Sequence, residues 1–278
     1  MSGYRFCRTD DIPLLVDAYN TCCGDHRRTE PPLTVEGFKR AARELGLWAS
    51  SSMIAFDGDA PIAVLLGAKR DDSNLVYRLA VRKGHEGRGH GRHLIDSLRR
   101  KIAILGPRRL VTEVPAGATG LCRFFERCGF TAERYYRDFV LAGAPAALRA
   151  AAELVSAVNV EELVQSGTLG PLPRPWERSL ATLISRSPEI DGLAITSDER
   201  VEAYVLHRIR SGACEIVALG AARSELLAPL LADLRRRGGA PARICKVAED
   251  EIPEALLAAL GFRRETEYIG YAANLGAP

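Results

Sequence analysis

The sequence predicts an α/β protein (mixed-sheet, α+β type) with two tandem domains, each a mixed, mostly antiparallel twisted sheet flanked by helices. Three observations support this prediction. Segments with strand and helix periodicity alternate along the chain, a glycine-rich turn separates one strand from the helix after it, and the whole pattern recurs in the second half. The chain has 278 residues, which suits two domains better than one, and its 47% apolar content can fill two cores.

The first half reads as strand, helix, helix, hairpin, strand, helix, strand, helix and strand. Local signals mark several of the boundaries. Asp10 and Asp11 precede the first helix as candidate caps, Pro13 lies in its first turn, and Gly46 ends the second helix. Asp57 and the glycine after it form the turn of the hairpin. The expected ranges, in the same order, are 4–11, 12–22, 34–46, 52–69, 74–81, 91–105, 108–114, 120–129 and 135–142.

The second half repeats the first at two constant offsets. Leu79 aligns with Leu219 at an offset of 140, and Gly129 aligns with Gly261 at an offset of 132. The second half is therefore eight residues shorter between these anchors, and the shortening falls where the first half has its glycine-rich turn. Because the order of elements and the turns also match, we infer a duplication.

The composition shifts between the two halves. An alanine-rich segment at 143–158 is followed by a run rich in glycine and proline at 167–175. We expect this region to be a join that contains some helix. The predicted domains are therefore 1–142 and 143–278.

The composition also argues against several classes of protein. The 38 basic residues only slightly outnumber the 35 acidic ones, too small an excess to indicate a nucleic-acid partner. The cysteines form no C-x-x-C motif and no cluster with histidines, so we expect reduced thiols, no metal site and a cytoplasmic location. We expect no membrane partner, because we find neither a secretory signal nor an apolar run of about 18 residues.

The glycine-rich turn at 84–92 follows a strand and opens a helix. This arrangement presents backbone N–H groups and a helix N-terminus to an anion. It lacks the Lys-Ser or Lys-Thr of a P-loop. It also lacks the third small residue of a dinucleotide fingerprint, since Arg92 or Leu94 stands in that place. A turn without a ligand and a site for another phosphate-bearing molecule both stay open.

Two motifs resemble those of the GNAT superfamily of N-acetyltransferases. The turn reads EGRGHG at 86–91, similar to the family's Gln/Arg-x-x-Gly-x-Gly/Ala. A later helix reads FFERCGF at 124–130, similar to the family's aromatic pair followed by Gly-Phe. With the matching order of elements, the resemblance covers 4–142 well, and 171–275 as a degenerate second copy.

The resemblance implies acetyl-CoA, or another acyl-CoA, as acyl donor. Its pyrophosphate would lie on the backbone N–H groups from Arg88 to Arg92, and its pantetheine arm along the preceding strand. Glu86 departs from the family's Gln or Arg, and we expect its carboxylate to turn outward, because it would repel a phosphate. The residues implied at the acyl-CoA are Leu79, Val81, Arg82, Glu86, Gly87, Arg88, Gly89, His90, Gly91, Arg92 and Phe125.

The resemblance also implies direct attack of a primary amine on the thioester. A base must first deprotonate the ammonium ion, whose pKa is about 10.4. Glu113 is our candidate base, and Tyr77 and Tyr136 are rivals that would act through a bound water. Phe125 stands where many relatives have a tyrosine that protonates the leaving thiolate. Either Tyr135 or Tyr136 would replace it, or the thiolate, with a pKa of about 8.5, leaves unaided.

We therefore expect an N-acetyltransferase with its chemistry in 1–142 and a small-molecule or peptide amine as acceptor. The alternative is a non-catalytic acyl-CoA-binding sensor or scaffold, which Glu86 and Phe125 favour. The second half lacks the glycine-rich turn, so we expect it to bind no CoA. The roles open to it are covering the acceptor side, extending the substrate cleft and forming a homodimer.

Overall fold

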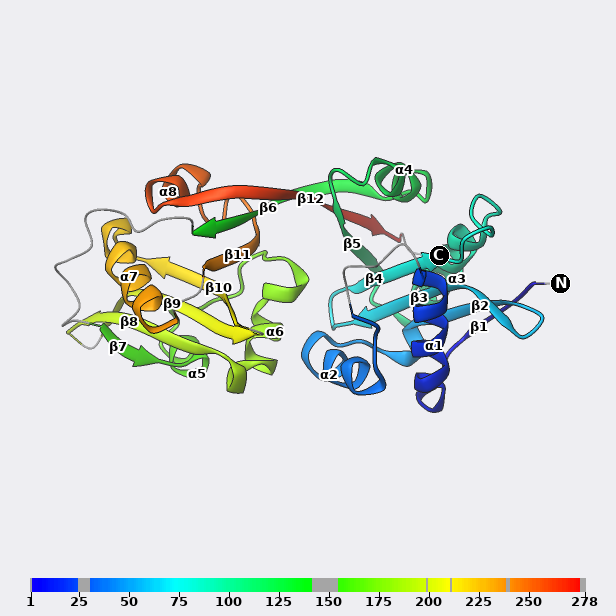
Figure 1. The fold of residues 1–278 in the computed structure, drawn as a ribbon, viewed down its shortest axis with the longest axis horizontal. Helices are drawn as coiled ribbons and strands as arrows, with labels where there is room; N and C mark the ends of the chain where they lie inside the picture. Colours follow the sequence, from blue (N-terminus) through cyan, green and yellow to red (C-terminus); the bar gives the residue numbers. More distant parts are fainter. Residues whose placement is uncertain are drawn as a thin grey trace. The chain divides into compact units, whose positions relative to one another are not determined.

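The computed structural model describes residues 2–24, 31–141, 155–198, 200–210, 212–238 and 241–275 (Figure 1). The chain divides into two compact units, and each is described by itself. Unit 1 consists of Met1–Val114, Ala118–Glu133 and Gly270–Pro278, and unit 2 consists of Pro115–Gly117 and Arg134–Ile269.

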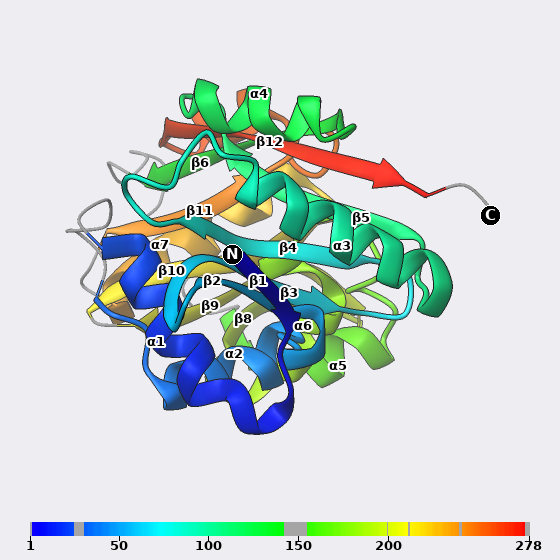
Figure 2. The ribbon, with the colours of Figure 1, turned by 90° about the vertical axis from the view of Figure 1, so that its right-hand side faces the viewer.

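Unit 1 has a mixed sheet with helices on both faces. In chain order its elements are β1 (Ser2–Phe6), α1 (Ile12–Cys23), α2 (Val35–Leu45), β2 (Met53–Asp57), β3 (Ala60–Lys69), β4 (Asn74–Val81), α3 (His90–Leu105), β5 (Arg109–Pro115) and α4 (Thr119–Arg127). Strands β1 to β4 are antiparallel neighbours, and β5 runs parallel to β4. The central strand β3 is buried from Ile62 to Ala68 because α1 and α3 contact it, and Figure 2 shows these helices on opposite sides of the sheet.

The boundaries of the helices follow from local chemistry. The hydroxyl of Thr34 caps α2 by accepting a hydrogen bond from the N–H of Gly37 at 2.9 Å. Gly46 ends α2 in the left-handed region, with φ 71°. Asp11 does not cap α1: its carboxylate accepts from the N–H of Arg8 at 2.8 Å. The expected order of strands and helices in the first half is confirmed.

Unit 2 repeats this order. It contains most of β6 (Thr131–Leu141), then β7 (Val155–Val158), α5 (Val160–Gln165), α6 (Leu180–Ser185), β8 (Asp191–Ser197), β9 (Arg200–Arg210), β10 (Ala213–Ala221), α7 (Leu227–Gly238), β11 (Ala242–Val247) and α8 (Glu254–Ala259). Successive residues of β9 point into different cores, because strand side chains alternate between faces. Ala203 and Val205 join the cluster beneath α7, whereas Tyr204 and Leu206 join the cluster beneath α5 and α6.

The strand register confirms the duplication. The parallel pair of unit 1 joins Asn74 to Leu110, and the parallel pair of unit 2 joins Cys214 to Ala242. The first strands of these pairs are related by the offset 140 and the second strands by the offset 132. Both offsets inferred from the sequence therefore recur in the backbone pairing, and the chain has a tandem fold.

The last strand of each copy contributes to both units. Strand β6 begins in unit 1 and ends in unit 2, where Phe139 pairs with Ile244 of β11. Strand β12 (Phe262–Asn274) begins in unit 2 and ends in unit 1, where the next residue, Leu275, donates its N–H to the carbonyl of Arg108 at 2.8 Å. The compact units therefore differ from a division of the chain at residue 142.

The second copy begins with a strand. Residues 143–154 of the expected join lie outside the described residues, but Val155–Val158 forms β7, which pairs antiparallel with β8. The expected join also contains helix, since α5 (Val160–Gln165) lies between the alanine-rich segment and the run rich in glycine and proline. Among the described helices, none is long and apolar enough to span a membrane.

Tyr271, near the end of β12, is expected to stabilise unit 1. Its ring is buried against Phe125, and its hydroxyl donates to a carboxylate oxygen of Glu126 at 3.0 Å. Tyr271→Ala leaves a cavity beside the buried Phe125, so it should lower the free energy of unfolding by about 3–5 kcal/mol. Denaturant titration measures this, and hydrogen exchange at α4 reports on unit 1.

The matched control is Tyr135→Ala, because Tyr135 is 65% exposed. We expect this control to change the free energy of unfolding by less than about 0.5 kcal/mol. Equal small effects of the two substitutions would contradict a structural role for the end of β12.

Candidate functional site

The turn between β4 and α3 has the backbone of an anion cradle. Gly84, Gly87 and Gly89 have φ of +85°, +74° and +87°, a region that other residues rarely adopt. A Cβ built on Gly87 or Gly89 would meet nothing within 4 Å, so these positions need glycine for conformation, and their outer side is open. The turn therefore has room for a ligand against its backbone.

The start of α3 completes the cradle. Gly89 is the N-cap of α3, and the N–H groups of the first helical turn have no partner within the helix. They point at the same space and carry the positive end of the helix dipole. Gly91 has a different reason to be glycine, since a Cβ there would lie 3.3 Å from Cζ of Phe124. Its absence lets α3 and α4 approach closely.

Strands β4 and β5 stop pairing with each other before β4 reaches this cradle. Their backbone pairing, within the described residues, covers Asn74 with Leu110 and Leu75 with Val111. The next contact is made by a side chain, the hydroxyl of Thr112, which donates to the carbonyl of Val76 at 3.1 Å. The register of β4 against β3 then shifts, and the extra residue is Tyr77. We call this opening the β4–β5 divergence.

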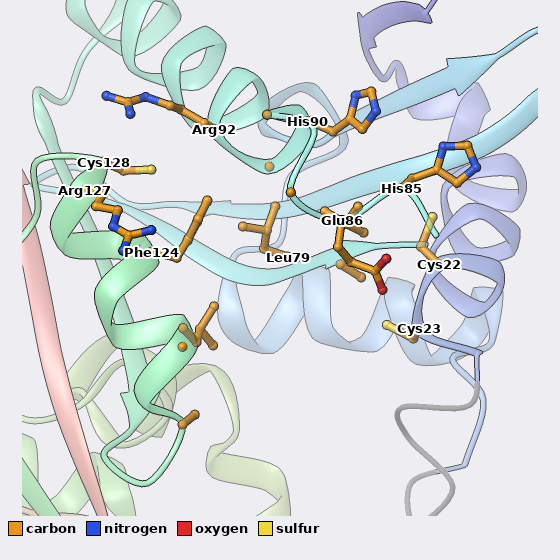
Figure 3. A pocket seen from close by; sticks show the side chains of 18 residues that line it. Cys22, Cys23, Leu79, His85, Glu86, His90, Arg92, Phe124, Arg127 and Cys128 are labelled. Carbon is orange, nitrogen blue, oxygen red and sulfur yellow. The ribbon is translucent and has the colours of Figure 1, made fainter. Parts of the chain in front are cut away.

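A pocket of about 1130 Å³ opens at the end of β4. Figure 3 shows its side chains, which come from the ends of α1 and β4, from the glycine-rich turn and the start of α3, and from α4. The lining residues are Cys22, Cys23, Leu79, Ala80, Val81, His85, Glu86, Gly87, Gly89, His90, Gly91, Arg92, Ala118, Gly120, Leu121, Phe124, Arg127 and Cys128.

Most of the residues expected at an acyl-CoA lie together in this pocket. Those that line it are Leu79, Val81, Glu86, Gly87, Gly89, His90, Gly91 and Arg92. Arg82 and Arg88 are exposed and do not line it. Phe125 is buried in the core of unit 1, with its ring centroid 5.2 Å from that of Phe130. The neighbouring Phe124 takes the place expected of Phe125, because successive helical residues point about 100° apart.

Glu86 performs a local task at the entrance of the turn. Its carboxylate accepts a hydrogen bond from the N–H of Gly84 at 2.6 Å. The side chain is exposed, but it lines the pocket, and Figure 3 shows its carboxylate directed toward the end of α1. The carboxylate is therefore accessible to solvent while it also borders the pocket. Because a glutamine oxygen could accept the same bond, the departure from the family motif preserves the local structure.

The histidine that opens α3 is tied to the first strand. His90 is buried, and its Nδ1 lies 2.6 Å from the hydroxyl of Tyr4 on β1. The ring of Tyr4 also lies against that of His93, with centroids 3.8 Å apart. These contacts hold the N-terminus of α3 in place. Among the described residues, no group of three or more His, Cys, Asp or Glu could hold a metal ion.

The sequence did not lead us to predict that residues of α1 and α4 line the pocket. Leu121, Phe124 and Arg127 recur at a helical spacing of three, a signal that could have placed them on one face. Two cysteines in the lining are poor nucleophiles. Burial raises the pKa of Cys22 to about 12 and also raises the pKa of Cys128, so both remain thiols near neutral pH.

The three candidate catalytic residues do not line this pocket. Glu113 is half-buried on β5, alternating with the buried Thr112 and Val114. Tyr77 is half-buried at the β4–β5 divergence. Tyr136 is buried on the part of β6 that belongs to unit 2, whereas the other two lie in unit 1.

Comparison with known proteins finds similarity at the level of a family model and of the fold. Residues 13–130 match the model of the acetyltransferase (GNAT) family. The fold is similar to that of a tandem GNAT protein from the clavulanic acid biosynthesis pathway, with a TM-score of 0.71, 16% identity and coverage of 99% of each chain. It is also similar to a GCN5-related N-acetyltransferase from Sphaerobacter thermophilus, with a TM-score of 0.68, 18% identity and coverage of 98% of this chain and 95% of that one. No curated protein matches the sequence.

Glu86→Gln tests the task assigned to this side chain. The amide oxygen should keep the bond to the N–H of Gly84 while the negative charge in the pocket is removed. We expect an unchanged melting temperature and an affinity for acetyl-CoA raised by about threefold to tenfold at low salt. Calorimetric titration measures the affinity. Glu86→Ala, which cannot accept the bond, is the comparison: weaker binding by Glu86→Gln than by Glu86→Ala would contradict this assignment.

Proposed function

We propose that this chain, a member of the GNAT acetyltransferase family with a tandem GNAT fold, transfers an acyl group from acetyl-CoA, or another acyl-CoA, to a primary amine at unit 1. The observation that carries the proposal is the cradle of left-handed glycines at the end of β4, which opens into a pocket beside two diverging strands. The acceptor in this proposal is a small-molecule or peptide amine.

The cradle would hold the pyrophosphate of the acyl-CoA. Backbone N–H groups from Arg88 to Arg92 supply donors, and the dipole of α3 adds to their effect. Arg92 and Arg127 line the pocket and supply positive charge, and Nε of Arg92 also lies 3.8 Å from a carboxylate oxygen of Asp96. The main chain of Leu79 and Val81 would pair with the pantetheine arm, since β4 has no β5 partner there.

The reaction is direct attack. The acceptor ammonium loses one proton to the base, its nitrogen forms a bond to the thioester carbonyl carbon, and the C–S bond breaks to release the CoA thiolate. The nitrogen then loses a second proton, which leaves a neutral amide and balances the protonation of the thiolate to a thiol. Glu113 on β5 is the proposed base, with Tyr77 at the strand divergence as the alternative through water. A backbone N–H near Val81 would hold the oxyanion. The protonated thiols of Cys22 and Cys128 support this route over an acyl-enzyme.

Phe125 cannot be the acid that protonates the leaving CoA thiolate. That side chain carries no proton and is packed away from the pocket. Tyr135 and Tyr136, on the unit 2 part of β6, are the two candidates from the sequence for this role. Because a thiol has a pKa of about 8.5, the thiolate can also leave without an acid near neutral pH.

Gly89→Glu tests the location of acyl-CoA. The substitution puts a side chain at φ +87° and a carboxylate into the cradle, so acetyl-CoA should bind at least about a hundredfold more weakly. The control is Gly167→Glu in unit 2, which has φ +72° and also has nothing within 4 Å of its Cβ position. Calorimetric titration should show normal binding to the control, and binding unaffected by Gly89→Glu would refute the placement.

Glu113→Gln tests the base. The amide keeps the size of the side chain but cannot take a proton, so kcat should fall about a hundredfold or more while KM for acetyl-CoA stays constant. Release of thiol from acetyl-CoA in the presence of a panel of amines measures the rate. Tyr77→Phe is the matched test of the rival. A loss with Tyr77→Phe and none with Glu113→Gln would move the role to Tyr77.

The second candidate function is a non-catalytic acyl-CoA sensor or scaffold. The apolar Phe125 at the position of the usual tyrosine favours it. Acetyl-CoA would then raise the melting temperature without thiol release from any amine in the panel. Release of thiol from acetyl-CoA with any amine of the panel would favour the enzyme over the sensor or scaffold.

A further inference from the structure

Unit 2 contains a second strand divergence at the equivalent place. Strands β10 and β11 run parallel and pair up to Ile216 with Ile244. The register of β10 against β9 then shifts, and the extra residue is Val217. At the offset of 140, Val217 is the counterpart of Tyr77, the bulged residue of β4. The backbone feature beside which unit 1 opens its pocket is therefore kept in the second copy.

A single guanidinium lies between the separating strands of unit 2. Arg178 donates from Nε to the carbonyl of Val217 on β10 at 2.9 Å. Its Nη1 donates to two carbonyls of β11, those of Cys245 at 3.1 Å and Lys246 at 3.2 Å. The side chain is 2% exposed, so the guanidinium replaces water and any ligand between these carbonyls.

One buried carboxylate holds this guanidinium in place. Glu251 accepts from Nη2 of Arg178 at 2.6 Å and from Nη1 at 3.1 Å, a two-point contact. It also accepts from Nε of Arg174 at 2.8 Å. The three side chains are almost completely buried, at 1 to 3% exposure. Nη1 of Arg174 is buried without a hydrogen-bond partner among the described residues, so the pairing of this buried cluster depends on the contacts that Glu251 makes.

An aromatic ring covers the neighbouring part of β10. Gly220 pairs with Tyr204 on β9, and a Cβ built on Gly220 would lie only 2.8 Å from Cε1 of that ring. The counterpart of Gly220 at the offset of 140 is Ala80, which lines the pocket of unit 1. The surface of β4 that is open to the pocket is therefore covered in β10 by a buried tyrosine.

We propose that Arg178, fixed by Glu251 and Arg174, permanently closes the strand divergence of unit 2, so that the protein has one acyl-CoA site per chain. The second copy is then closed by its own side chains and not only by the absence of a glycine-rich turn. The counterparts of the three residues in unit 1, at the offsets of 140 and 132, are Phe38, Thr34 and Thr119, none of which is charged. The statement about acyl-CoA rests on the proposed function, whereas the closure rests on unit 2 alone.

Chemical rescue tests the closure. Arg178→Ala leaves a guanidinium-shaped space beside a buried carboxylate and three carbonyls, and it should lower the melting temperature by on the order of 10 °C. Methylguanidinium at about 10 mM should raise the melting temperature of this variant by several degrees and leave that of the wild type unchanged. The control is Arg208→Ala, whose guanidinium pairs with Glu215, a carboxylate that is 28% exposed. Absence of a rise specific to Arg178→Ala would overturn the proposal.

A second readout covers a variant that does not fold. In that case, Arg178→Ala is refolded from denaturant with and without methylguanidinium, and the yield of folded protein is compared. Recovery only with methylguanidinium supports the closure, and equal yields overturn it. The same comparison with methylammonium, which lacks the planar fork of donors, should show no recovery.

Calorimetric titration with acetyl-CoA tests the stoichiometry. We expect one molecule per wild-type chain and none for Gly89→Glu. Two molecules per wild-type chain, of which Gly89→Glu removes only one, would overturn the closure of unit 2, whereas one molecule in both proteins would refute only the placement at the glycine-rich turn. No binding to the wild type would overturn the proposed function of unit 1, and rescue of Arg178→Ala would still decide the closure.

Discussion

The separation of two parallel strands after a bulge is the constraint on which the rest of each unit depends. Parallel strands normally stay paired along their length, because each backbone N–H and C=O needs a partner. In unit 1, pairing between β4 and β5 ends at Leu75 and Val111, and Tyr77 is the bulged residue beyond it. The carbonyls and N–H groups that follow must find other partners, and a ligand or a side chain has to supply them.

The two copies meet this requirement in different ways. Unit 1 leaves Leu79 to Val81 facing a pocket and ends β4 in a cradle of backbone N–H groups. Unit 2 brings Arg178 between its strands, where five polar atoms of the surrounding protein accept its hydrogen bonds. A duplicated fold can therefore keep its sheet register while one copy keeps an opening and the other fills it. The strand register is compatible with an open and with a filled divergence, because the bulge is a feature of the backbone and does not require a ligand.

The exchange of final strands gives the second half a role in the first unit that does not depend on binding CoA. The end of β12 lies in unit 1, where Tyr271 packs on Phe125 and bonds to Glu126 of α4. Helix α4 carries Phe124 and Arg127, which form a wall of the pocket. Burial raises the pKa of Tyr271, so its hydroxyl remains a hydrogen-bond donor to Glu126. The pocket is thus supported by residues from the end of the chain.

The sequence by itself determined the order of elements, the duplication with both of its offsets, and the glycine-rich turn with most of the residues that surround it. Each of these rests on local signals, since turns, caps and periodicity depend on neighbours along the chain. Only the tertiary structure decided which of Phe124 and Phe125 reaches the pocket, that Cys22 and Cys23 lie in it, and that Arg178 occupies the strand divergence of unit 2. It also decided that Val155–Val158 is a strand and that β6 and β12 end in units other than those in which they begin. These outcomes depend on packing between residues far apart in sequence, and the pattern of a strand does not specify the sheet that will accept its hydrogen bonds.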